Sequence, residues 1–140
     1  MNIFIDSDVV ISSLLSDKGA SFQLLYKKNL YLYISSLSYA ELNIVIQRFD
    51  ISTARLDALI KKQLKTIELD ITKEKMHKDY DRYVADYNDA HIVAGAHRSN
   101  ARFLISYNLK HFNRELIQKD FDCIIMTPGS YLQYLRSLNM

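Results

Sequence analysis

Three acidic side chains stand beside or inside apolar patterns, where a carboxylate could serve as a ligand or a catalytic group. Asp6 directly follows the apolar residues 3–5. Glu41 falls inside the apolar arc of a helical stretch, residues 37–49, when side chains are placed about 100° apart around a helix. Asp89 begins an apolar stripe that continues three, four and seven residues later. Burying a carboxylate costs several kcal/mol unless a partner compensates its charge, so the three acids together predict a shared cation.

Each acid also has a structural interpretation that involves no ligand. Asp6 and Asp8 can both cap the helix expected after the first apolar run, because a carboxylate accepts hydrogen bonds from free backbone N–H groups. Glu41 can reach solvent through a gap in its helix face, or pair with Arg48. Asp89 can be a first-turn acid favoured by the helix dipole, and we expect Asp86 to be the cap of that helix rather than a ligand.

The residue types point to a hard divalent metal. Carboxylate oxygens suit Mg²⁺ or Mn²⁺, whereas Zn²⁺ prefers His and Cys. Cys123 is the only cysteine. His91 and His97 are six residues apart, which puts them on different helix faces, and His77 and His111 are isolated. We therefore expect Mg²⁺ or Mn²⁺ as the cofactor, with the histidines at the surface or supporting the ligands.

The elements that must position these acids are short apolar runs alternating with longer stretches of helical period. This alternation is typical of an α/β fold with a mostly parallel sheet and helices on both faces. Such sheets place ligand sites at the carboxyl ends of their strands, which is where Asp6 stands. The predicted strands are residues 2–5, 31–34, 67–69, 103–105 and 123–126.

Three of the helices have recognisable starts. Ser52 or Thr53 can cap a helix with a one-sided apolar stripe. Thr72 can open a second helical stretch, whose tyrosine-rich stripe extends to Tyr87. A last helix is expected after Pro128.

The composition is that of an ordinary folded domain. The 140 residues are 49% hydrophobic and 24% charged, so we expect one domain, residues 1–140. The net charge of +2 does not by itself indicate nucleic-acid binding, so any site for a polyanion must be local. A single cysteine excludes an internal disulfide and fits a reducing compartment, which predicts a cytoplasmic protein. No apolar run approaches the roughly 20 residues that span a bilayer.

Four motifs in order resemble the PIN domain family, and within it the small VapC-type toxins. These are IFIDSDVVI (residues 3–11), SYAEL (38–42), DYNDAHIVAGA (86–96) and FLISYNLKHF (103–112). The junction at residues 125–128, from strand to helix, fits the same pattern. Each motif is weak alone, but their order covers nearly the whole chain.

The resemblance implies a three-layer α/β/α sandwich whose acidic pocket binds magnesium or manganese and hydrolyses phosphodiester bonds in RNA. Asp6, Glu41 and Asp89 match the family's acids, so it implies that they are the catalytic and metal-binding residues. A homodimer and a small antitoxin protein that covers the acidic pocket are the implied partners. The implied function is a metal-dependent endoribonuclease, the toxin of a VapBC-type pair.

The chain departs from the family pattern near its fourth acid. Asn108 fills a slot where the family often has Asp or Asn, and His111 stands before Phe112 where the family often has an acid, so the fourth acid is missing in both slots. The first motif carries Asp8 where Asn or Ser is common. We hypothesise that Asp8 replaces part of the lost charge as a further metal ligand, while Ser106 and Asn108 supply neutral oxygens or hold water around the metal.

Candidate RNA contacts cluster around the fourth motif. Basic side chains would contact phosphates and an exposed aromatic ring would stack on a base, although plain surface charge explains the basic residues equally well. The candidates are Arg98, Arg102, Tyr107, Lys110, His111 and Arg114.

Two alternatives compete with the nuclease. A strand followed by Asp6 and Asp8 is also how haloacid-dehalogenase-like phosphatases begin, with the first Asp as nucleophile and the second as acid/base. That interpretation gives Glu41 no role. The other alternative is a PIN fold that has lost its chemistry with its fourth acid and only binds RNA or protein.

Overall fold

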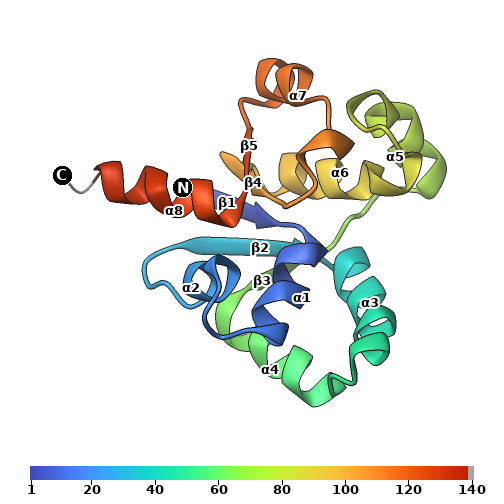
Figure 1. Cartoon of the computed structure of the whole chain (residues 1–140). Coiled ribbons are helices and arrows are strands. Elements are labelled where there is room, and N and C mark those ends of the chain that lie inside the picture. Colours follow the sequence, from blue (N-terminus) through green and yellow to red (C-terminus); the bar gives the residue numbers. More distant parts are fainter. Residues whose placement is uncertain (139–140) are drawn as a thin grey trace.

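A five-stranded, all-parallel sheet forms the centre of the computed structural model, which describes residues 1–138 (Figure 1). Strand β1 is central and pairs with β2 on one side and β4 on the other. The order across the sheet is β3 (Lys65–Ile67), β2 (Tyr31–Ser35), β1 (Asn2–Ile5), β4 (Phe103–Ile105) and β5 (Ile124–Met126). The predicted α/β fold with a parallel sheet is confirmed.

Helices cover both faces of the sheet, which confirms the three-layer α/β/α arrangement. Figure 1 shows α5, α6 and α7 on one side of the strands and α1 to α4 on the other. The first group is α5 (Lys73–Tyr80), α6 (Ala90–Arg98) and α7 (Arg114–Phe121). The second is α1 (Ser7–Leu15), α2 (Ala20–Leu25), α3 (Ser36–Val45) and α4 (Thr53–Gln63), and α8 (Pro128–Leu138) packs on the same core.

The two layers of core follow the alternation of side chains along β1. Ile3 and Ile5 point into the core under α1, α2, α4 and α8, while Phe4 points into the core under α6. Gly95 of α6 lies directly over the Phe4 ring, and a Cβ at this position would collide with it. The missing side chain at Gly95 therefore lets α6 approach the centre of the sheet.

Several predicted boundaries are confirmed by their caps. The Ser52 hydroxyl accepts from the N–H of Arg55 at the start of α4, and the Thr72 hydroxyl accepts from the N–H of Lys75 at the start of α5. Helix α8 begins at Pro128. Among residues 1–138 no helix is both long enough and apolar enough to cross a membrane.

Three predicted elements differ from the structure. The third strand is Lys65–Ile67 rather than 67–69, because an edge strand tolerates exposed polar residues and its apolar pattern is weak. The stretch from Thr72 is helical only to Tyr80, beyond which a 3₁₀ turn, η2 (Asp81–Tyr83), redirects the chain. The stretch after Leu37 is α-helical to Val45 and then continues as the 3₁₀ segment η1 (Ile46–Phe49).

Candidate active site

Asp6 lies at the carboxyl end of β1, where its carboxylate is held by two donors. The backbone N–H of Ser7 donates to Oδ1 at 2.7 Å, and the Ser106 hydroxyl donates to Oδ2 at 2.8 Å. Ser106 directly follows β4, so the two central strands present these groups at the same edge of the sheet. Asp6 is also the N-cap of α1, so the capping interpretation and the site position coexist in one residue.

Asp8 secures the loop that follows β4. Its Oδ2 accepts from the Tyr107 N–H at 3.1 Å and from the Asn108 side-chain amide at 3.0 Å. Its Oδ1 is buried and has no hydrogen-bond partner among the described residues. Burial first, and then the neighbouring charge of Asp6, raises the pKa of Asp8 to about 7. A buried carboxylate oxygen with no hydrogen-bond partner at this point is a candidate metal ligand.

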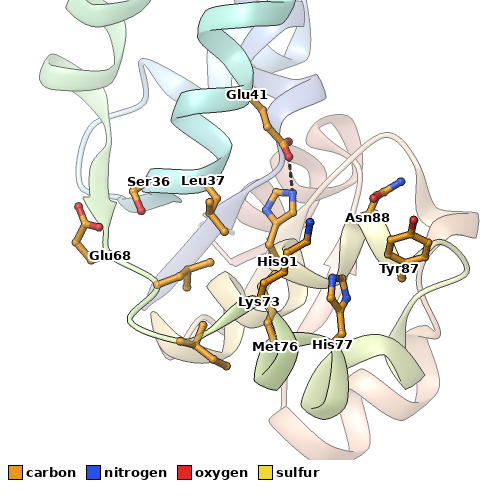
Figure 2. Close-up of a pocket in the computed structure, with 12 residues that line it drawn as sticks. Ser36, Leu37, Glu41, Glu68, Lys73, Met76, His77, Tyr87, Asn88 and His91 are labelled. Carbon is orange, nitrogen blue, oxygen red and sulfur yellow. Dashed lines mark ion pairs between the residues drawn. The ribbon is translucent and has the colours of Figure 1, made fainter.

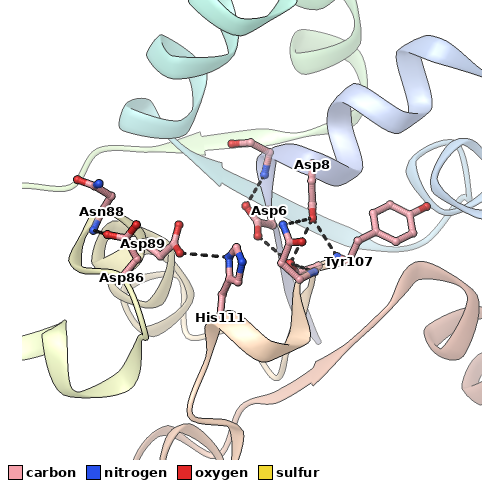
Figure 3. A network of polar contacts seen from close by, with 10 residues as sticks. Asp6, Asp8, Asp86, Asn88, Asp89, Tyr107 and His111 are labelled. Atoms are coloured by element: carbon pink, nitrogen blue, oxygen red, sulfur yellow. Dashed lines mark hydrogen bonds and ion pairs between the residues drawn. The ribbon is translucent and has the colours of Figure 1, made fainter.

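Asp89 ends the 3₁₀ segment η3 (Tyr87–Asp89) and directly precedes α6. Its Oδ2 lies 3.3 Å from Nδ1 of His111 (Figure 3). Burial is the main cause that raises the pKa of Asp89, and the nearby charges of Asp86 and Glu41 add to it while His111 opposes it. Asp86 accepts from the Asn88 N–H at 2.9 Å, so it caps the 3₁₀ segment η3 that leads into α6, whereas the N-cap position of α6 itself is Asp89.

Glu41 reaches the same region from α3, but not from a buried arc. Its side chain is 57% exposed, and its Oε1 lies 3.2 Å from Nε2 of His91 (Figure 2). Leu37 and Ile44, which share the expected apolar arc with Glu41, are also exposed. The expectation that this arc faces the core is therefore wrong. Helix α3 packs on the core through a different stripe, Ser38 and Leu42, which is continued by Ile46.

The three acids share an electrostatic environment centred on His91. Burial is the largest cause of the raised pKa of Asp6, the charge of Asp89 adds to it, and His91 lowers it. His91 also acts on Asp89 and contacts Glu41 directly. The charge of Asp89 thus reaches Asp6 and the charge of Glu41 reaches Asp89, although each acid has a hydrogen-bonding or ionic neighbour of its own.

The residue types at this site fit a hard divalent cation. In residues 1–138, no Lys or Arg forms an ion pair with Asp6, Asp8, Glu41 or Asp89. The same residues contain no ready-made group of three or more His, Cys, Asp or Glu that could hold a metal. Mg²⁺ commonly uses one or two carboxylates, several waters and the substrate's phosphate, so it does not need a complete protein cage. The unpartnered Oδ1 of Asp8 is the observation that favours this fit.

His91 is the site residue that sequence reasoning did not single out. Its side chain is only 8% exposed, and the sequence signal was a polar ring inside the otherwise apolar start of α6. His111 was expected at the surface or in a supporting role, and it contacts Asp89. His77 and His97 are engaged elsewhere, with Asp81 and the Tyr80 hydroxyl respectively.

The predicted RNA contacts fall into two groups. Tyr107, Lys110 and His111 lie in the exposed loop after β4 beside the acids, and Arg114 begins α7 just beyond. Arg98 ends α6, and Arg102 precedes β4, so both lie toward the opposite edge of the sheet. Arg102 is also paired with Asp122. Arg98 and Arg102, although near the fourth motif in sequence, therefore lie apart from the other four candidates.

Comparison with known proteins places this geometry in a family context. A family model described as "PIN domain" matches residues 2–110. No curated protein matches the chain in a sequence search.

Solved structures with a similar fold include three toxin or toxin–antitoxin proteins. VapBC2 from Rickettsia felis, bound to a DNA fragment from its promoter, matches with a TM-score of 0.62 and 16% identity over 91% of this chain and 98% of that chain. A toxin–antitoxin complex from Klebsiella pneumoniae matches with a TM-score of 0.64 and 18% identity over 90% and 97%. VapC20 from Mycobacterium tuberculosis, a toxin that cleaves the sarcin–ricin loop, matches with a TM-score of 0.54 and 15% identity over 85% and 95%.

Proposed function

This chain belongs to the PIN domain family, and we propose that it is a metal-dependent endoribonuclease, the toxin of a VapBC-type toxin–antitoxin pair. The observation that carries the proposal is that Asp6, at the carboxyl end of β1, and Asp89, at the start of α6, lie close enough for the charge of Asp89 to raise the pKa of Asp6, while no Lys or Arg of the described chain pairs with either. Such carboxylates are best satisfied by a divalent cation.

Asp6, Glu41 and Asp89 would hold Mg²⁺ or Mn²⁺, with Asp8 as a further ligand. The bound ion would polarise the scissile phosphoryl group and lower the pKa of a water molecule, which then becomes the nucleophile. Ser106 fixes the orientation of the Asp6 carboxylate by donating to Oδ2.

The loop after β4 is the proposed RNA side of the site. Asp8 anchors this loop through the Tyr107 backbone and the Asn108 amide, so the exposed Lys110 and His111 stand beside the acids. Lys110 and Arg114 contribute positive charge for phosphates, and the Tyr107 ring is available to stack on a base. The hydroxyl of Tyr107 bonds to Ser21 at 2.6 Å, which holds that ring in place.

A small antitoxin protein is the proposed partner. The Klebsiella pneumoniae structure is a toxin–antitoxin complex, and the Rickettsia felis structure is a VapBC2 complex. We propose by analogy that an antitoxin covers the acidic pocket, that the chain acts as a homodimer, and that both work in the cytoplasm. If the chain is purified after native expression and no small protein co-purifies with it, the antitoxin assignment is contradicted.

The remaining alternative within the family is a fold that binds RNA or protein without cleaving. Its support is the missing fourth acid: Asn108, whose amide donates to Asp8, occupies a slot where the family often has Asp or Asn, and His111 occupies the other slot. The phosphatase alternative loses its basis, because the PIN model covers residues 2–110 and includes both Asp6 and Asp8.

RNA cleavage separates these functions. Pure protein is incubated with mixed cellular RNA in the presence of Mn²⁺ or EDTA, alongside Asp89→Asn. We expect cleavage with Mn²⁺ alone, and none with EDTA or with Asp89→Asn. RNA that is bound but left intact by folded wild-type protein with Mn²⁺ would show the non-catalytic alternative to be right.

A further inference from the structure

A cleft of about 490 Å³ opens next to the acids, between α3 and α5 (Figure 2). Its volume lies in the range of about 300–1,000 Å³ that is usual for sites of small organic ligands. Glu41 and His91 line this cleft and also belong to the candidate active site. A nucleotide next to the scissile phosphate would therefore place its base at the mouth of the cleft.

The walls of the cleft suit the flat, apolar face of a base. Leu37 of α3, Ile71 of the loop before α5, and Met76 of α5 line it. Tyr87 is 61% exposed, and its ring meets the His77 ring edge-on, with centroids 5.3 Å apart and an interplanar angle of 75°. Bases of single-stranded RNA are commonly bound by stacking on exposed aromatic rings of this kind.

Charge in the cleft disfavours a phosphate group and favours a base edge. Glu41 and Glu68 both line it, and a phosphate placed between two carboxylates would be repelled. Carboxylate and amide oxygens accept hydrogen bonds from the amino and imino groups of bases. Lys73 also lines the cleft, and it forms no ion pair within the described chain, so its charge is available for the phosphate that precedes or follows the base.

An unpartnered polar atom supports a ligand at this position. Nδ1 of His91 is buried, and it has no hydrogen-bond partner among the described residues, although Nε2 contacts Glu41. In Figure 2 this nitrogen lies on the side of the ring that faces Leu37. Buried side-chain nitrogens are rarely left without a partner, which makes this atom a candidate to hydrogen-bond with a ligand bound in the cleft.

We propose that the cleft binds one unstacked RNA base beside the cleavage site and thereby determines sequence preference. This inference rests on the proposed nuclease function for its biological meaning, but binding of a base is measurable without cleavage. The competing occupant is a segment of a partner protein, and the experiment below distinguishes the two.

Methyl NMR of the full-length chain tests the proposal. The chain has four methionines, and Met76 lines the cleft whereas Met1 and Met126 do not. With ¹³C-methyl-labelled methionine, AMP, CMP, GMP and UMP are titrated in turn, and inorganic phosphate serves as the probe without a base. We expect a saturable shift of the Met76 methyl with at least one nucleotide, no shift with phosphate alone, and unchanged Met1 and Met126 signals.

A pair of matched variants locates the binding. Leu37→Trp fills the cleft from an exposed position on α3, and Ile44→Trp adds the same bulk two turns later, outside the cleft. Leu37→Trp should weaken nucleotide binding at least about tenfold while Ile44→Trp leaves it unchanged. If no nucleotide shifts the Met76 methyl signal of the wild-type protein, the cleft does not bind a base, and a protein occupant is favoured. If that same protein cleaves RNA, only the base site fails and the nuclease proposal stands.

Discussion

Nε2 of His91 lies 3.2 Å from Oε1 of Glu41, which joins α6 on one face of the sheet to α3 on the other, at the carboxyl end of β1. The imidazole is buried, and the carboxylate is more than half exposed. The contact therefore closes the site on its inner side and leaves an acid facing the solution from which RNA would arrive. It also brings the third acid, Glu41, close enough for its charge to raise the pKa of Asp89.

Removing the charge of Glu41 should affect activity far more than stability. In Glu41→Gln the amide oxygen can still accept from Nε2 of His91, and exposed ion pairs contribute only about 0–1 kcal/mol. We expect unfolding in urea within ~1 kcal/mol of wild type and RNA cleavage at least about tenfold slower. Glu74→Gln, an exposed acid in the first turn of α5, is the matched control and should match wild type in both. Cleavage by Glu41→Gln at the wild-type rate would show that Glu41 is not part of the active site.

The metal-free protein should lose stability as the pH rises. The pKa of Asp8 is about 7 in the folded chain against an ordinary value of 3.8, and the pKa of Asp6 is also raised. The folded state therefore holds protons that the unfolded chain has already released, so its stability is greatest below about pH 4 for these groups and is lost as the pH rises through about 7. Urea unfolding with EDTA across this range measures the slope.

Asp8→Asn is the control for that slope. It removes the titrating group while keeping an oxygen that accepts from Tyr107 and Asn108. The variant should show a flatter dependence than wild type, and an equally steep one would show that Asp8 is not responsible. Unchanged Mn²⁺ affinity and cleavage rate in Asp8→Asn would also contradict its assignment as a further ligand.

Substitution of glycine by alanine should have opposite effects on stability at two positions in helices. Gly95→Ala places a Cβ against the Phe4 ring, and overpacking of this kind costs about 1–3 kcal/mol. Gly129→Ala in α8 meets nothing within 4 Å and should stabilise by up to about 1 kcal/mol through helix propensity. Denaturant melts measure both. Gly95→Ala that is as stable as Gly129→Ala would mean that α6 does not lie against Phe4 as described.

The effect of removing a basic side chain on RNA binding should depend on which end of the sheet carries that side chain. Lys110→Ala should weaken RNA binding by several-fold and reduce its salt dependence, because Lys110 lies beside the acids. Arg102→Ala should leave RNA binding and cleavage unchanged, since Arg102 lies at the amino end of β4 and pairs with Asp122. Binding measured at several salt concentrations decides this, and equal losses in both variants would contradict the placement of the RNA side.

The fold was predictable where one local signal dominated. Strand β1 and the turn to Asp6 follow from an uninterrupted apolar run, and the starts of α4 and α5 follow from the caps Ser52 and Thr72. Strand β3 was misplaced because Lys65 and Thr66 are exposed at the sheet edge and carry no apolar pattern.

The partners of the site residues depend on long-range contacts that periodicity does not encode. Glu41 was assigned to a buried arc because α3 has apolar residues on several sides, and only the packed structure shows which side is covered. The contact between Glu41 and His91 joins residues 50 positions apart, and the bonds from Tyr107 and Asn108 to Asp8 join residues about 100 apart. No spacing rule within a helix or strand connects such pairs.

Titration of the metal-free protein with Mn²⁺ tests most directly whether the carboxylates share one cation. Wild type, Asp6→Asn and Asp89→Asn are compared by calorimetry, with circular dichroism as the check of folding. Asn caps a helix about as well as Asp, so Asp6→Asn should stay folded. We expect saturable binding by wild type and at least ~10-fold weaker binding by each variant. Folded Asp6→Asn and Asp89→Asn proteins that bind Mn²⁺ as tightly as wild type would show that these two acids do not hold a common metal.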